Sequence, residues 1–160
     1  EDPRVDPSDK ENEAIRYASL KGHVEIVKLL LEDPRVDPSA LHNYAIRWAS
    51  LNGQLEVVKL LLKDPRVDPS DFDNEAIRLA SENEHLEVVK LLLKDERVDP
   101  SDWDNKTIKE AYSNGHLDVV KLLLKDQRVI NTLSIEDYNK LMDAQEKKRA
   151  KEWQEREDRI

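Results

Sequence analysis

The chain has 160 residues, of which 38% are charged, and 26 basic against 35 acidic side chains give a formal net charge of −9. Nucleic acid binders use clustered Lys and Arg to neutralise phosphates, so this balance argues against a nucleic acid partner and favours a protein partner. The absence of cysteine excludes disulfides and thiolate metal sites. No apolar run approaches the roughly 18 residues that span a bilayer and no secretory signal opens the chain, so we expect an intracellular, cytoplasmic protein with no membrane contact.

A seven-residue phrase recurs along the chain at a fixed interval of 31 residues. DPRVDPS occupies residues 2–8, 33–39 and 64–70, and DERVDPS occupies residues 95–101. All seven prolines fall at two positions of this period, and all three glycines fall at one. Such self-similarity is typical of repeat architectures. We therefore predict a repeat array over residues 1–133, with units at about 2–32, 33–63, 64–94 and 95–125 and a partial fifth connector at 126–133.

Each unit predicts two short helices and a connector. In NEAIRYAS at residues 12–19, Asn12 is expected to cap the first helix by accepting a hydrogen bond from an unpaired N–H group of its first turn. Gly22 follows this helix, where a left-handed backbone is often required. A second helix is expected from about His23 to Glu32, because its apolar residues recur at helical spacing. The prolines of DPRVDPS exclude helix from the connector, and only its valine is expected to face inward.

Helices of this length are marginal alone in water, so they persist only by packing on the next copy. The expected fold class is all-α, a solenoid of stacked helix-turn-helix units. A residue type that is repeated in every unit then becomes a ladder along the stack. We interpret one basic ladder as structural, since functional residues usually differ between repeats. Its members are Arg16, Arg47, Arg78 and Lys109.

The segments GHVEIVKLLLEDPRVDPS at residues 22–39 and GHLDVVKLLLKD at residues 115–126 resemble the ankyrin repeat, in which Gly-His opens the second helix. The resemblance implies a curved solenoid that recognises proteins through a concave groove and protruding turns. The period is two residues shorter than the usual length of about 33, which implies shorter turns. The Thr-Pro-Leu-His signature of the family is absent. The corresponding residues are EAIR at 13–16, YAIR at 44–47, EAIR at 75–78 and KTIK at 106–109.

The units differ from one another at the turn tip and along the first helix, and a repeat protein varies the positions that meet a partner. Aromatic residues concentrate there, and Trp and Tyr often carry interface energy. By the resemblance, these positions would line the groove and the turn tips. An alternative is that Tyr17, Trp48 and Leu79 fill the seam between helices. The candidate partner-binding residues are Tyr17, Leu41, His42, Tyr44, Trp48, Leu51, Phe72, Leu79, Trp103 and Lys106.

The sequence contains no pattern that predicts catalysis, a cofactor or a metal site. Three histidines share one position of the unit, which separates them by repeat widths, far beyond ligand distances of about 2 Å. They are expected at helix starts. No nucleophile elbow, phosphate-binding loop or zinc-protease motif occurs. The leading interpretation is a non-enzymatic protein-interaction module. The alternative is a structural spacer or assembly component that stacks with copies of itself.

The two ends predict different surroundings. Residues 134–160 are expected to form a capping and solvated helix, in which Ser134 and Asp137 make a capping arrangement. An apolar stripe would cover the last unit, formed by Ile135, Tyr138, Leu141 and Met142. At the other end the first unit keeps the apolar pattern of interior units, although a terminal repeat should be polar outside. We therefore expect the chain to be part of a longer repeat array, or its first face to be covered by another molecule.

Overall fold

The computed structural model of the protein describes residues 6–157. Within this range the chain forms ten helices and no strand. The helices are α1 (Asp9–Lys21), α2 (Val24–Glu32), α3 (Ala40–Leu51), α4 (Leu55–Leu62), α5 (Asp71–Glu82), α6 (Leu86–Leu92), α7 (Asp102–Ser113), α8 (Leu117–Leu123), α9 (Gln127–Thr132) and α10 (Ile135–Glu157).

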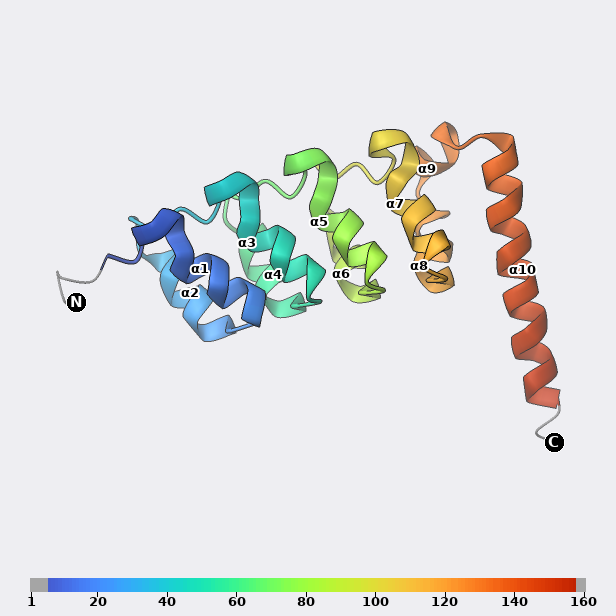
Figure 1. The fold of residues 1–160 in the computed structure, drawn as a ribbon, viewed down its shortest axis with the longest axis horizontal. Helices are drawn as coiled ribbons and strands as arrows, with labels where there is room; N and C mark the ends of the chain where they lie inside the picture. The colour runs from blue at the N-terminus through green and yellow to red at the C-terminus, as the bar shows by residue number, and fades with distance from the viewer. Residues whose placement is uncertain (1–5, 158–160) are drawn as a thin grey trace.

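The first eight helices form a row of consecutive pairs, with α10 at the far end of the row (Figure 1). The first helices of the pairs pack in order, α1 on α3, α3 on α5 and α5 on α7, and the second helices follow the same order. Each pair therefore has its sequence neighbours on either side. This arrangement confirms the predicted all-α solenoid of helix-turn-helix units with a long C-terminal helix.

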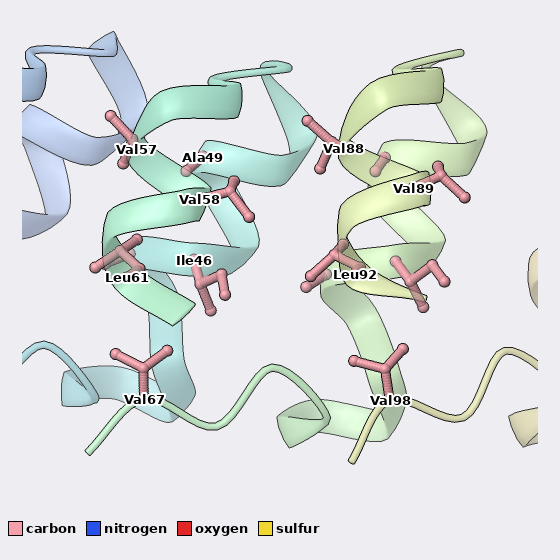
Figure 2. Close-up of a cluster of buried hydrophobic side chains, with 14 of the residues drawn as sticks. Ile46, Ala49, Val57, Val58, Leu61, Val67, Val88, Val89, Leu92 and Val98 are labelled. Atoms are coloured by element: carbon pink, nitrogen blue, oxygen red, sulfur yellow. The ribbon is translucent and has the colours of Figure 1, made fainter. Parts of the chain in front are cut away.

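Equivalent positions of successive units form the core, as Figure 2 shows for two neighbouring units. Every labelled side chain is at most 2% exposed. The labelled residues are Ile46, Ala49, Val57, Val58 and Leu61 of the second unit, Val67, Val88, Val89 and Leu92 of the third, and Val98 of the connector that opens the fourth. Burial of this apolar surface contributes about 25 cal/mol per Å², and in a stack much of it is buried between neighbours. The same few positions therefore stabilise every seam.

The connector contributes two buried positions to each unit. Its valine faces inward as expected, with at most 1% of the side chain exposed at Val36, Val67, Val98 and Val129, whereas Val5 lies outside the described residues. The second proline is also buried, at Pro38, Pro69 and Pro100. The expectation that only the valine faces inward was therefore wrong. A proline ring is apolar and brings no backbone N–H that would need a partner, so it can be buried there without loss of a hydrogen bond.

Each first helix begins with an unusual turn. Three consecutive residues have left-handed dihedral angles, with φ between 50° and 62°, before the right-handed helix starts. These turns comprise residues 10–12, 41–43, 72–74 and 103–105. Left-handed backbone costs a non-glycine residue about 1–2 kcal/mol, so other contacts must hold it in place. We call these segments the turn tips.

The asparagine that ends each turn tip supplies such contacts. Asn43 is 4% exposed, and its Oδ1 accepts a hydrogen bond from the backbone N–H of Asp68 at 2.8 Å. Its Nδ2 donates to Oδ2 of Asp71 at 2.9 Å, so both bonds reach the next unit. Asn12 and Asn74 accept the equivalent backbone bonds. The prediction that these asparagines cap their own helices was wrong, because the next unit offers polar groups to a buried amide.

The glycine after the first helix has the left-handed conformation that was expected. Gly22 and Gly53 have φ of 74° and 66°. A Cβ atom at Gly53 would lie 2.6–2.9 Å from ring atoms of His85 in the next unit, so the position also needs the missing side chain. Glu84 occupies the equivalent position of the third unit with φ of 59°. One unit therefore places a side chain where the others have none.

The helix α10 covers α8 at the C-terminal end of the row (Figure 1). The Ser134 hydroxyl accepts a hydrogen bond from the N–H of Asp137 at 3.0 Å, as the capping pattern predicts. Leu141 is 3% exposed, and the Gln145 side chain donates to the carbonyl oxygen of Leu117 at 2.6 Å. Ile135 was expected in the covering stripe but is 82% exposed. Its place in the first turn of α10 leaves it beside the array rather than on it.

Candidate interaction surface

The turn tips hold large apolar side chains in solvent. Phe72 and Trp103 occupy the first position of their tips and are 53% and 56% exposed, and Leu41 at the same position is 41% exposed. The Oδ1 atom of Asp71 accepts the N–H of Phe72 at 2.7 Å, and Asp102 holds Trp103 in the same way. The tips therefore present a row of apolar groups, one for each of three units, on an ordered backbone.

Basic side chains lie against the aromatic rings at the tips. The Arg47 guanidinium lies 4.5 Å from the centroid of Phe72, and that of Arg78 lies 5.9 Å from the centroid of Trp103. Nζ of Lys106 lies 3.6 Å from the Trp103 ring. Such cation–π contacts contribute about 0.5–1 kcal/mol at exposed sites. Because each arginine belongs to the preceding unit, the stack itself orients the tip rings.

The first helices form an alternating charge network beside the tips. Arg47 pairs with Glu75, which also accepts from Arg78 at 3.0 Å. Arg78 in turn lies 3.6 Å from Glu110, which pairs with Lys106 at 3.6 Å. The side chains of Arg47, Glu75 and Arg78 are only 13–15% exposed. Acidic groups thus separate the like charges of the basic ladder, which is the interleaving that such a ladder requires.

The candidate residues divide into exposed and half-buried groups. At the tips, Leu41, His42, Phe72 and Trp103 are exposed, and the His42 ring lies 5.7 Å from that of Phe72. Along the first helices five candidates are half-buried, namely Tyr44, Trp48, Leu51, Leu79 and Lys106.

Tyr44 and Trp48 stack on each other within one helix, with ring centroids 5.1 Å apart. Tyr17 occupies the position of Trp48 in the first unit but is 56% exposed, because no unit lies on that side among the described residues. Half-burial of Trp48 and Leu79 fits the alternative in which this position fills the seam between units. Apart from Tyr17, the exposed candidates lie at the tips.

The histidines at the start of the second helices bond across the seam. Nε2 of His85 lies 2.9 Å from the carbonyl oxygen of Leu51, and Nε2 of His116 lies 2.9 Å from that of Glu82. Gln54 reaches the equivalent carbonyl of Leu20 at 3.5 Å. The sequence carried a signal for this role, since the position is occupied by His or Gln in all four units and both side chains can donate a hydrogen bond. Among residues 6–157, no group of three His, Asp or Glu side chains is arranged to hold a metal ion.

The connectors carry a further ladder of arginines, whose bonds between units the sequence did not reveal. Arg66 donates from Nη1 to the carbonyl oxygen of Val36 at 2.7 Å. Arg97 and Arg128 make the equivalent bonds to Val67 and Val98, one and two units further along the chain. Each arginine also pairs with the Asp two residues before it. Hydrogen bonds from the Arg35 guanidinium hold the pKa of Asp33 down at about 2. These pairs orient arginines that connect the units.

No helix in the described part of the chain is long and apolar enough to cross a membrane. A comparison with protein families matches the model described as ankyrin repeats (3 copies) over residues 2–73 and 46–134. The matched segments together extend over residues 2–134, most of the chain. A comparison with curated proteins gives no match.

Proposed function

Because the chain belongs to the ankyrin repeat family, whose repeats are generally protein–protein interaction modules, we propose that it binds a protein partner through its turn tips and first helices and catalyses no reaction. The first helices would line the concave side of the array, with the tips at its rim. Leu41, His42, Phe72 and Trp103 would make the outer contacts. The half-buried candidates would form the floor beside them.

One observation gives the strongest support to partner binding by the tips. Three of the eight most exposed large apolar side chains in the described range stand at the same position of consecutive units, at Leu41, Phe72 and Trp103. Exposure of these side chains gives the fold little beyond the cation–π contacts of the two aromatic rings, whereas an aromatic group that becomes buried on binding is a common source of interface energy. Identity varies at this position while its backbone stays the same. That combination suits recognition.

The charges around the tips favour a partner with basic and apolar side chains. Asp71 and Asp73 flank Phe72, and Asp102 and Asp104 flank Trp103. The side chain of Asp104 is 86% exposed although it pairs with Lys109. Complementary charge across an interface raises the association rate and selects partners. Binding should therefore weaken as the salt concentration rises.

An affinity capture with three forms of the chain as bait tests this proposal. The wild type should retain a protein from native extract that the double variant Phe72→Ala, Trp103→Ala does not retain. Trp153→Ala is a matched control, because Trp153 is 59% exposed and belongs to the C-terminal end of α10, a segment that lies away from the row of helix pairs (Figure 1). Trp153→Ala should melt within about 3 °C of the wild type, since surface substitutions rarely cost more than about 0.5 kcal/mol, whereas the double variant also loses the cation–π contacts of its two rings and should melt no more than about 8 °C lower.

Other results of the capture, together with thermal stability and light scattering, would favour other interpretations of the tips and of the array. Equal capture by the double variant would contradict a role for the tips, and a large loss of thermal stability would assign these rings to the fold. A molar mass in light scattering that rises with concentration, with no captured partner, would favour a spacer or assembly component. Simple end-to-end stacking of copies would, however, require the C-terminal face of the array, which α10 covers.

A further inference from the structure

The outer side of α1 and α2, before the first helix pair, exposes residues whose equivalents in later units are buried or half-buried. We call this surface the N-terminal face and define it by Ala14, Tyr17, His23, Ile26 and Leu29. Tyr17, Ile26 and Leu29 are 56%, 49% and 67% exposed. The positions equivalent to Ile26 are at most 2% exposed in all three later units, at Val57, Val88 and Val119. The apolar surface of an interior seam is therefore repeated here without its cover.

Polar groups on this side also match those of the interior seams. His85 and His116 each place Nε2 2.9 Å from a carbonyl oxygen of the preceding unit, whereas the imidazole ring of the equivalent His23 has no hydrogen-bond partner within residues 6–157. The second carboxylate oxygen of Asp71 accepts from an asparagine of the preceding unit. In the first unit the equivalent Asp9 receives no such bond within the described range. The His23 ring and the Asp9 carboxylate therefore lie at the positions where a seam would use them as hydrogen-bond donor and acceptor.

The N-terminal face is hollowed rather than flat. A cavity of about 650 Å³ lies over it, and its walls include Ala14, Tyr17, Ala18 and Ile26. Acidic and polar groups surround this apolar centre, among them Asp9 and His23. An apolar centre with polar groups at its edge is the pattern of a surface made to be covered.

The interior seams show what kind of cover fits. In each of them the preceding unit supplies its first helix for apolar packing, a buried asparagine for the connector, and a carbonyl oxygen near the end of that helix for the His or Gln side chain. The connector DPRVDPS at residues 2–8 repeats the phrase that at 33–39 and 64–70 joins one unit to the next. The N-terminal face and the connector phrase thus both fit a preceding repeat unit.

A second copy of the chain does not supply that neighbour. The surface that would have to pack on the N-terminal face is the C-terminal side of an array, and in this chain α10 covers it. Leu141 is buried there, and Gln145 already occupies the carbonyl oxygen of Leu117. Two N-terminal faces placed together would oppose Asp6, Asp9 and Glu13 of one copy to those of the other. Like charges that face each other across an interface destabilise it.

We propose that the N-terminal face is an open seam whose occupant is a further ankyrin-type repeat, joined through the connector at residues 2–8. This repeat would carry an asparagine for the connector N–H of Asp6 and for Asp9, and a carbonyl oxygen for Nε2 of His23. It would bury Ile26 and partly cover Tyr17 and Leu29, as the later seams do with their equivalents. This inference does not depend on what the turn tips bind.

An extended chain tests the proposal directly. A copy of residues 33–63 is placed before Asp2, so that its Asn43 and Leu51 carbonyl meet the N-terminal face in register. Hydrogen exchange of the α1 amides should slow by at least about tenfold relative to the original chain, because opening of α1 would then require loss of a whole seam. Helical content per residue, measured by circular dichroism, should not fall.

The variants His23→Ala and His85→Ala show whether a true seam forms. In the original chain His23→Ala should leave the denaturant midpoint unchanged, whereas His85→Ala should lower it. In the extended chain both variants should lower the midpoint by similar amounts. An added unit that stays unfolded, unchanged exchange of α1, or a His23→Ala variant that has no effect in the extended chain would overturn the proposal. So would a cost of His23→Ala in the original chain equal to that of His85→Ala, since that result would mean that the face is already covered.

Discussion

The seams between units and the turn tips come from the same 31-residue period but use it in opposite ways. At the seams the same residue types recur, and side chains such as Ile46 and Ile77 are fully buried. At the first tip position the residue changes from Leu41 to Phe72 to Trp103, and each is at least 41% exposed. Stability therefore depends on positions that stay constant, which leaves the tips free to vary. A partner surface can change in such a molecule without a change of fold.

The two regions meet within single turns. Phe72, Asp73 and Asn74 all have left-handed backbone, yet the first two are exposed and Asn74 is only 6% exposed. Its side chain bonds to Asp99 and Asp102 of the next unit. We infer that these seam bonds offset the backbone strain and so hold Phe72 outward. Substitutions that affect the seam but not the tip, or the reverse, test this difference between the two regions.

Replacement of a seam asparagine should have the largest effect. Asn74→Ala removes the acceptor of the Asp99 N–H, at 2.7 Å, and the donor to Asp102, at 2.8 Å. A buried polar group left without a partner costs about 1–3 kcal/mol, so the loss of unfolding free energy in urea should lie near the top of that range. Asp73→Ala, one residue earlier in the same left-handed turn, should cost less than about 1 kcal/mol. Equal costs would mean that the turn alone, and not the seam, supports Asn74.

Substitutions at the glycine position should have intermediate effects on stability. They should stabilise the protein in one unit and destabilise it in another. Glu84→Gly should stabilise the protein by about 1 kcal/mol, because it relieves a non-glycine residue with φ of 59°. Its exposed contact with Nδ1 of His116, at 3.4 Å, contributes little. Gly53→Ala should destabilise by more than about 1 kcal/mol, since its Cβ would meet the His85 ring. Thermal unfolding of both variants measures the difference, and a destabilised Glu84→Gly protein would refute this interpretation.

The connector pairs should give the smallest effect, and it should depend on pH. Hydrogen bonds from Arg97 lower the pKa of Asp95 below its ordinary value of 3.8. A carboxyl group whose pKa is lower in the folded state contributes stability above its unfolded pKa and loses it as the pH falls through the folded pKa. The wild type should therefore lose stability below about pH 4, and Asp95→Asn should lose less.

Urea midpoints measured from neutral pH down to about pH 2.5 test this prediction. Arg97→Gln should flatten the profile as Asp95→Asn does, because the low pKa of Asp95 depends on that guanidinium. The difference at this one pair should stay below about 1 kcal/mol, since the arginine side chain is 44% exposed. A profile that remains as steep in both variants as in the wild type would show that other carboxyl groups control acid unfolding.

Variation between units selected the candidate positions, but it could not predict which of them are exposed and which are half-buried. The sequence placed Trp48 and Trp103 in one candidate set, yet Trp48 is half-buried on Tyr44 while Trp103 is 56% exposed. Both lie in units of the same pattern, and only their position relative to the next helix separates them. The sequence also placed Asn12 correctly at the start of the right-handed helix but assigned its hydrogen bonds to the wrong partner.

The sequence by itself determined what is local and periodic in this protein: the helix pairs, the buried valine of each connector, the left-handed glycine and the capping of α10 by Ser134. Each follows from residue spacing or from one residue's conformational preference, which a single unit contains. The tertiary structure alone decided the bonds of Asn43, His85, Arg66 and Gln145, whose partners lie 25 to 34 residues away along the chain. Those partners come within reach only when neighbouring units stack, because the register between units, and not the spacing within one, brings the groups together.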